Sequence, residues 1–309
     1  VFIIKADNPT VVLLHKVVVR SINFLITGKI IATLEEIIGH VSDPGVDILS
    51  IVKKFNIPTE FSSKIAKELE TVPSEVLGID MSERVDIRKR QIVTIDGADA
   101  KDLDDAISLI ILENGNYELG VHIADVSHYV QKGTAIDEEA LARGTSVYLA
   151  DRVIPMLPHQ LSNGVCSLNP NVDRLTLTCD MEIDTDGNVV NTGVYQSIIH
   201  SSARMTYVDV NTLLEKKDEK LANKYTAFLE LFERMDVLAK ILAKKRHTRG
   251  SLDFEIDEVK IIVDEVGKAI DVKVRERGVA EKIIEQFMIE ANESIAAVFM
   301  KKAWPFIYR

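Results

Sequence analysis

The densest group of chemically reactive side chains in this sequence is a cluster of aspartates. Five of them fall within ten positions: Asp96, Asp99, Asp102, Asp104 and Asp105. Carboxylates this close repel one another strongly wherever the dielectric is low, and strand interiors disfavour aspartate. A divalent cation would remove the repulsion, and hard oxygen ligands suit Mg²⁺ or Mn²⁺. The cluster therefore indicates a metal site, and a solvated acidic turn is the plainer alternative.

Two apolar runs flank the aspartates and must position them. Residues 92–95 read Ile-Val-Thr-Ile, and residues 106–112 read Ala-Ile-Ser-Leu-Ile-Ile-Leu. Short runs rich in β-branched residues predict buried strands, which would place the aspartates in the connection between two strands. The spacing and closing glutamate of an EF-hand are absent. A calcium-binding structural protein stays open as an alternative, and it would fold in a Ca²⁺-dependent way.

The order of these residues resembles a known family. Thr94-Ile95-Asp96-Gly97 followed by Asp102-Leu103-Asp104-Asp105-Ala106 is similar to the signature of the ribonuclease II / ribonuclease R family, whose members are hydrolytic 3′→5′ exoribonucleases with an RNB catalytic domain. The resemblance implies that Asp96, Asp102 and Asp105 hold one or two Mg²⁺ ions, with Mn²⁺ as a substitute. It also implies that Asp104, together with Asp102, acts in catalysis.

Three further residues match RNA-contacting positions of the family, and a fourth is a candidate contact. Tyr148 and Phe254 fall where the family has aromatic residues that stack on the bases at the 3′ end. Base–aromatic stacking contributes about 1–3 kcal/mol per base and tolerates any base, as a sequence-independent exonuclease requires. Tyr207 falls where the family has an RNA-contacting tyrosine. Glu285 lies in a stretch similar to a helix of the family and is a candidate RNA contact, with a surface or packing role as the alternative. Without the family match, a tyrosine such as Tyr148 would be read as a core or interface residue.

The resemblance also implies a substrate and partners. The expected substrate is the 3′ end of single-stranded RNA, degraded to 5′-nucleoside monophosphates during RNA turnover. RNA-degradation or ribosome-associated proteins are candidate partners. A second function is a non-catalytic RNA-binding or scaffold protein with the same fold. Incubation with labelled RNA in Mg²⁺ and in EDTA would separate the two.

His122 and Asp125 lie in the sequence His-Ile-Ala-Asp-Val, which the family shares in similar form. By residue type both could bind a metal. We interpret them instead as hydrogen-bonding residues that shape the wall of the site.

Composition sets the broad class. The 309 residues are 46% hydrophobic and 28% charged, which is typical of a globular protein. The sequence has no apolar run close to the roughly 20 residues of a membrane span and no signal peptide at its start, so we expect no membrane association. Cys166 and Cys179 form no disulfide framework, which favours a reducing cytoplasm. The net charge of −11 does not exclude RNA, because a local groove decides binding.

The remaining patterns predict the architecture. We expect an α+β fold, in which a partial OB or cold-shock-type β-barrel at 1–42 and a helical connector at 43–91 precede an RNB catalytic domain at 92–309 with a mixed sheet and packed helices. Asn114-Gly115 predicts a hairpin turn. Alternation predicts strands at 175–183 and 189–199, and helical spacing predicts helices at 221–242 and 280–299. The family's catalytic domain continues past this stretch, so we expect the chain to hold its first part.

Overall fold

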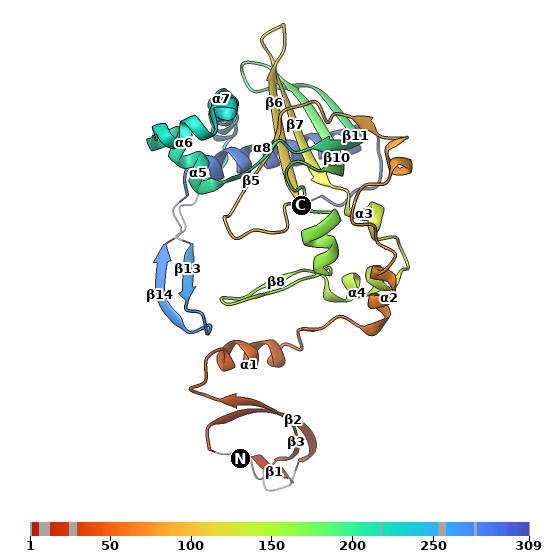
Figure 1. The fold of residues 1–309 in the computed structure, drawn as a ribbon, viewed down its shortest axis with the longest axis vertical. Helices are drawn as coiled ribbons and strands as arrows, with labels where there is room; N and C mark the ends of the chain where they lie inside the picture. Colours follow the sequence, from red (N-terminus) through yellow and green to blue (C-terminus); the bar gives the residue numbers. More distant parts are fainter. Residues whose placement is uncertain are drawn as a thin grey trace. The chain divides into compact units, whose positions relative to one another are not determined.

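The computed structural model describes residues 2–5, 13–24, 30–216, 218–252, 258–274 and 277–308. The chain forms two compact units, each assembled from separate stretches (Figure 1). The first comprises Val1–Ser63, Glu138–Met156 and Ile256–Arg275, and the second comprises Lys64–Asp137, Leu157–Glu255 and Glu276–Arg309. The domain boundaries expected after residues 42 and 91 follow the sequence order and stay a prediction.

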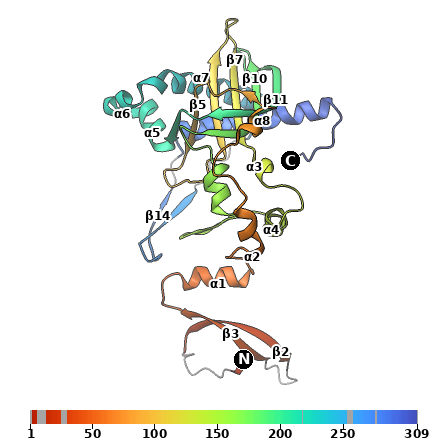
Figure 2. The same ribbon diagram turned by 45° about the vertical axis from the view of Figure 1, so that its right-hand side comes forward.

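The first unit contains a three-stranded sheet in the order β1-β3-β2, which Figure 2 shows below α1. Strand β2 pairs antiparallel with β3, and β1 runs parallel to β3. Two small hairpins, β8 with β9 and β13 with β14, belong to the same unit. The bounds are β1 Phe2–Lys5, β2 His15–Phe24, β3 Ile30–His40, α1 Val46–Lys54, β8 Val147–Tyr148, β9 Val153–Ile154, β13 Val259–Val263 and β14 Ala269–Val274.

The second unit is built on a mixed seven-stranded sheet in the order β12-β5-β6-β7-β10-β11-β4. The middle strands pair antiparallel, whereas β4 runs parallel to β11 and β12 runs parallel to β5. The bounds are β4 Val85–Asp86, β5 Ile92–Asp96, β6 Asp105–Ile111, β7 Tyr117–Ala124, β10 Asp173–Ile183, β11 Val189–His200 and β12 Ala203–Thr206. The expected hairpin at Asn114-Gly115 is confirmed, because it joins β6 to β7.

The long helix expected at 221–242 is two helices. Helix α6 ends at Lys224, Tyr225 adopts φ −112° and ψ 27°, and α7 then continues to Thr248. The expected helix at 280–299 is confirmed as α8. The helices are α2 Ser63–Leu69, η1 Gly78–Met81, α3 Val126–Tyr129, α4 Ala135–Arg143, η2 Gln160–Val165, α5 Tyr207–Asn211, η3 Thr212–Lys216, α6 Glu219–Lys224, α7 Thr226–Thr248 and α8 Val279–Lys301.

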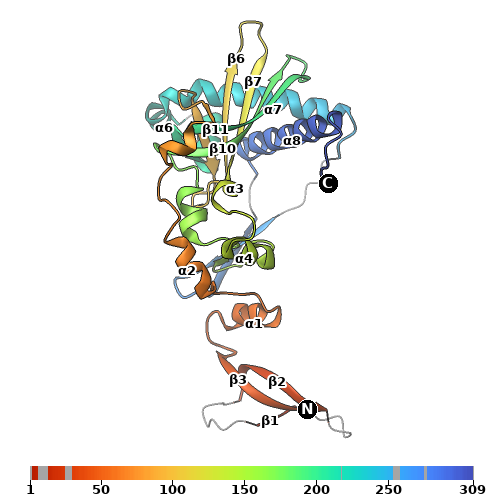
Figure 3. The same cartoon turned by 90° about the vertical axis from the view of Figure 1, so that its right-hand side faces the viewer.

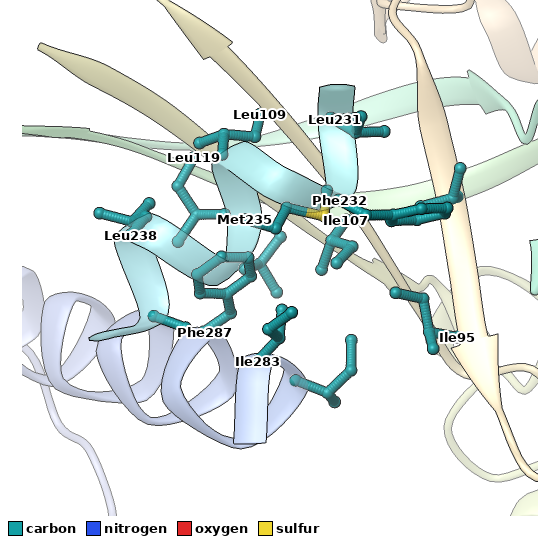
Figure 4. Packing of buried hydrophobic residues seen from close by; sticks show 14 of the residues in the cluster. Ile95, Ile107, Leu109, Leu119, Leu231, Phe232, Met235, Leu238, Ile283 and Phe287 are labelled. Atoms are coloured by element: carbon teal, nitrogen blue, oxygen red, sulfur yellow. The ribbon is translucent and has the colours of Figure 1, made fainter. Parts of the chain in front are cut away.

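Helices α7 and α8 lie side by side across one face of this sheet (Figure 3). The main core fills the space between them and the strands. Phe232 and Phe287 are fully buried there against inward-facing residues such as Ile107 and Leu119, as Figure 4 shows. Fully burying a side chain of this size contributes about 1.5–3 kcal/mol relative to leaving it exposed. This face therefore supplies most of the apolar stabilisation of the unit.

A smaller apolar cluster covers the opposite face of the sheet, because alternate residues of a strand point to opposite sides. Its members are Ile87, Ile92, Leu103, Ala106, Ala124, Leu168 and Ile199. Leu103 belongs to the aspartate stretch itself and is only 1% exposed. The segment that carries the carboxylates is thus anchored to the sheet by its one leucine.

Two expectations from composition can be compared with the structure. Cys166 and Cys179 are both free and buried. Within the described residues, no helix combines the length and the apolar character needed to cross a membrane.

Candidate active site

The sheet brings the two ends of the aspartate stretch to one edge. Strand β5 ends at Asp96 and β6 begins at Asp105. The two strands are antiparallel neighbours, with Val93 opposite Ile107. Because the end of one strand meets the start of its antiparallel partner, residues 97–104 form a loop at this edge. We call residues 97–104 the acidic loop.

The acidic loop is tied to its surroundings through its backbone. The amide of Ala124 donates to the carbonyl of Asp104 at 2.9 Å, and the amide of Leu168 donates to the carbonyl of Leu103 at 2.8 Å. Nη2 of Arg204 also donates to the carbonyls of Ala98 at 3.1 Å and Ala100 at 2.6 Å. The backbone that presents the carboxylates is therefore fixed from several directions.

The carboxylates of the site influence one another electrostatically. Burial, and then the charges of Asp105, Asp104 and Asp102, raise the pKa of Asp96 to about 7, while Arg204 opposes this shift. Asp104 lies at the surface, but partial loss of hydration together with the charges of Asp102 and Asp105 raises its pKa to about 6. Burial also raises the pKa of Asp105. The four aspartates form one coupled group of negative charge.

Two buried oxygens beside this group lack a hydrogen-bond partner among the described residues: Oδ2 of Asp96 and Oγ1 of Thr94. They lie two residues apart on β5 and so on the same face of the strand. An unpaired buried acceptor costs about 1–3 kcal/mol, more when it is charged. A cation beside Asp96 would remove that cost and also lower its pKa.

The donor set fits a hard divalent cation by its chemistry, since it consists of carboxylate oxygens that repel one another. The side chains are not gathered into a ligand shell, however. In the part of the chain that the structure describes, no three His, Cys, Asp or Glu side chains converge closely enough to enclose a metal ion. The assignment of Asp96, Asp102 and Asp105 as metal ligands therefore stays a prediction.

The parallel pairing of β12 with β5 puts Tyr207 one residue beyond the position opposite Asp96. Thr206 stands opposite Asp96 in that pairing, and Tyr207 follows as the first residue of α5. The Oγ1 of Thr206 accepts a hydrogen bond from the amide of Asp209 and so caps this helix. The ring of Tyr207 is partly buried against the main core.

Glu285 occupies a different setting. It lies on α8 and lines a cavity of about 380 Å³ between α7 and α8, together with the cations Lys240, Arg246, Arg277 and Lys282. Its carboxylate forms an ion pair with Arg277. None of the four aspartates is among the described residues that line this cavity. The structure thus does not join Glu285 and the aspartates in one cavity.

The two residues predicted to stack on RNA bases are Tyr148 and Phe254. Tyr148 lies on β8 of the first unit and is 68% exposed. Phe254 lies outside the described residues.

His122 and Asp125 are both buried and hydrogen-bonded, as the sequence interpretation expected. His122 contacts the hydroxyls of Ser108 at 3.0 Å and Thr178 at 2.8 Å. Asp125 pairs with Arg84 at 2.5 Å. Both side chains already have partners inside the protein, which leaves them little capacity to bind a metal.

Sequence reasoning did not single out two residues that hold the acidic loop, Arg204 and Ser167. Arg204 reaches the loop only because β12 lies beside β5, and Ser167 contacts it across a separation of more than sixty residues. No local motif announces either contact.

The family described as RNB domain matches residues 84–309, and the family described as cold shock domain matches residues 1–62. Ribonuclease R of Thermotoga maritima is 50% identical over 281 residues, which is 90% of this chain but only 39% of that relative. The chain therefore spans less than half of the length of this relative.

Two solved structures of Mycoplasma genitalium RNase R share the fold. The complex with double-stranded RNA aligns with a TM-score of 0.88 at 29% identity, covering 98% of this chain and 54% of that one. The complex with ribose-methylated single-stranded RNA aligns with a TM-score of 0.87 at 29% identity, covering 98% of this chain and 47% of that one. With the mixed sheet described above, these matches confirm the predicted α+β fold with an N-terminal cold-shock-type region.

Proposed function

The chain belongs to the RNB family, and from that premise we propose that it carries the metal-dependent centre of a hydrolytic 3′→5′ exoribonuclease. The substrate would be single-stranded RNA, shortened from its 3′ end to 5′-nucleoside monophosphates. The observation that carries this proposal is the coupled group of Asp96, Asp102, Asp104 and Asp105 where β5 and β6 meet. Such crowding of carboxylates is unfavourable unless a cation neutralises it.

The aspartates would have different roles in the reaction. Asp96, Asp102 and Asp105 would hold Mg²⁺, or Mn²⁺ in its place. When bound, the metal would supply an acidified water and neutralise charge on the leaving oxygen. Asp104 would orient the attacking water or the departing 3′-hydroxyl. As a general base it would take the proton from that water.

RNA would be held by stacking and by polar contacts. Tyr148 is exposed enough to stack on a base, and we assign Phe254 the same role from the family match. Tyr207, which follows the residue that stands opposite Asp96, would contact the RNA near the cleaved bond. Glu285, in a cavity rich in cations, would face the nucleotide. The RNA complexes of Mycoplasma genitalium RNase R support RNA as the ligand.

Other members of an RNA-degradation pathway or the ribosome would be partners of such an enzyme. The free, buried thiols of Cys166 and Cys179 suit a reducing compartment, and we propose the cytoplasm.

The test is a cleavage assay on the complete natural polypeptide that contains these residues. A single-stranded RNA labelled at its 5′ end is incubated with Mg²⁺, with Mn²⁺ and with excess EDTA, beside a DNA of the same sequence. We expect a ladder that shortens one nucleotide at a time from the 3′ end, with 5′-monophosphates as the released product. EDTA should abolish the ladder, and the DNA should persist.

Internal cuts, or a ladder that is unchanged in EDTA, would contradict the proposal. Tight binding of RNA without any cleavage in Mg²⁺ or Mn²⁺ would instead support the second function, a non-catalytic RNA-binding protein with the same fold.

A further inference from the structure

The hydroxyl of Ser167 makes two hydrogen bonds to the acidic loop, one on each side of Asp102. It donates to the carbonyl of Lys101 at 2.9 Å and accepts from the amide of Leu103 at 3.1 Å. Ser167 is completely buried. One oxygen atom therefore satisfies a buried donor and a partly buried acceptor of the loop at once, with Asp102 between them.

Neighbouring contacts make this hydroxyl part of a larger support. The next residue, Leu168, binds the carbonyl of Leu103 through its amide, and both leucine side chains lie in the small apolar cluster. The guanidinium of Arg174 donates hydrogen bonds to the carbonyl of Ser167 at 2.7 Å and to the carbonyl of Gly164 at 3.2 Å. Arg174 is itself buried. The hydroxyl is thus held on a rigid base rather than on a mobile loop.

Resting on the function proposed above, we propose that Ser167 is a positioning residue that sets the backbone of the acidic loop and thereby the direction of its carboxylates. It lies away from the reacting atoms and acts only through residues 101–103. Carboxylates in a catalytic group must be held within a fraction of an ångström, and a small misplacement can cost about 100-fold in rate. Removing the hydroxyl should therefore reduce turnover more than it reduces substrate binding.

The variant Ser167→Ala removes one oxygen and keeps the backbone contacts of Leu168. Ser197→Ala is the matched control, because Ser197 is also fully buried and its hydroxyl is also hydrogen-bonded inside the protein. Its partners are the hydroxyls of Thr176 at 2.7 Å and Thr178 at 2.6 Å and, at 3.4 Å, the carbonyl of Thr176. The control lies on β11 and has no bond to the acidic loop among the described contacts. The two variants should lose similar amounts of thermal stability.

In the complete protein, we expect Ser167→Ala to lower kcat for single-stranded RNA about 10- to 100-fold, with KM within about twofold of the parent protein. The Mg²⁺ concentration that gives half of the maximal rate should rise. Ser197→Ala should leave all three quantities within about twofold. Equal kcat values for the two variants would overturn the proposal.

A second measurement does not depend on catalysis. Amide hydrogen exchange of a peptide covering residues 100–105 should be about tenfold faster in Ser167→Ala than in Ser197→Ala. If the parent protein fails to cleave RNA, the proposed function fails, but faster exchange would still support the positioning role and unchanged exchange would reject it. If Ser167→Ala does not fold, Ser167→Cys offers a weaker acceptor of similar size, and unchanged kcat and exchange in that variant would also reject the proposal.

Discussion

Nη2 of Arg204 lies 2.6 Å from the carbonyl oxygen of Ala100 in the acidic loop. The same nitrogen also holds the carbonyl of Ala98 at 3.1 Å. Arg204 is on β12, and its charge acts against the rise in the pKa of Asp96. One cation therefore serves two purposes, since it fixes the first half of the loop and partly offsets the crowded negative charge.

We predict that Arg204→Ala lowers the free energy of unfolding by about 1–2 kcal/mol, because two carbonyls lose a charged donor that is partly exposed to solvent. Urea denaturation measures this change. Arg234→Ala is the control, because the ion pair of Arg234 with Glu230 is exposed and should contribute less than about 1 kcal/mol. Equal losses in the two variants would show that the contacts with the loop carry no stability.

Asp104→Asn should keep RNA binding and abolish cleavage. The amide has the size of the carboxylate but cannot accept a proton, and loss of a general base costs about 100- to 10,000-fold in rate. The measurements are single-turnover cleavage in Mg²⁺ and RNA affinity in EDTA, both on the complete protein. Asp186→Asn, which makes the same change in the exposed turn between β10 and β11, should leave both unchanged. Cleavage by Asp104→Asn at the parental rate would refute the role.

Tyr148→Ala should weaken the binding of single-stranded RNA by about 1–3 kcal/mol, which corresponds to roughly 5- to 150-fold in Kd. Tyr148 is 68% exposed, so its replacement should change the stability of the protein very little. Fluorescence anisotropy in EDTA measures the affinity without cleavage. Tyr148→Phe keeps the ring and should bind RNA like the parent protein. An unchanged affinity of Tyr148→Ala would exclude stacking by this residue.

The parts of this fold that are local in sequence could be predicted. The apolar runs on both sides of the aspartates predicted β5 and β6, and Asn114-Gly115 predicted the turn into β7. The helical spacing of apolar residues predicted both ends of α8 to within two residues. The break at Tyr225 was missed, because apolar residues continue at helical spacing from α6 into α7 and only the backbone conformation of Tyr225 interrupts them.

The supports of the site could not be predicted, because they join distant stretches of sequence. The place of Thr206 opposite Asp96 depends on a parallel pairing between strands more than a hundred residues apart. The contact of Ser167 with Leu103 has the same character. Periodicity and turn residues encode local structure and say nothing about which distant segments meet. The residue types of the site were therefore visible in the sequence, and the framework that orients them was not.

The buried ion pair of Arg84 with Asp125 gives a further prediction. The side chains are 4% and 1% exposed, and their atoms lie 2.5 Å apart. Arg84→Met should destabilise the protein by about 3–5 kcal/mol, because Asp125 would keep a buried charge without its cation. The double variant Arg84→Met with Asp125→Leu should recover most of the loss. Urea denaturation of all four proteins gives the coupling, and simple additivity of the two single variants would contradict a paired role.

His122 predicts how stability depends on pH. Burial lowers its pKa to about 4 from an ordinary value of 6.5, while the nearby charges of Asp180 and Arg90 act in opposite directions. Between pH 4 and pH 6.5, His122 is protonated in the unfolded chain and neutral in the folded chain. The stability from neutral His122 is therefore fully present above pH 6.5 and is lost as the pH falls towards 4, by about 3 kcal/mol in all.

His122→Asn isolates this contribution, because every other titrating group is unchanged. The parent protein should be the more stable at pH 7, where His122 bonds to Ser108 and Thr178. Its advantage should shrink by about 3 kcal/mol when urea denaturation is repeated between pH 6.5 and pH 4. Parallel stability curves for the parent and His122→Asn would mean that His122 is not held neutral by its burial in the sheet.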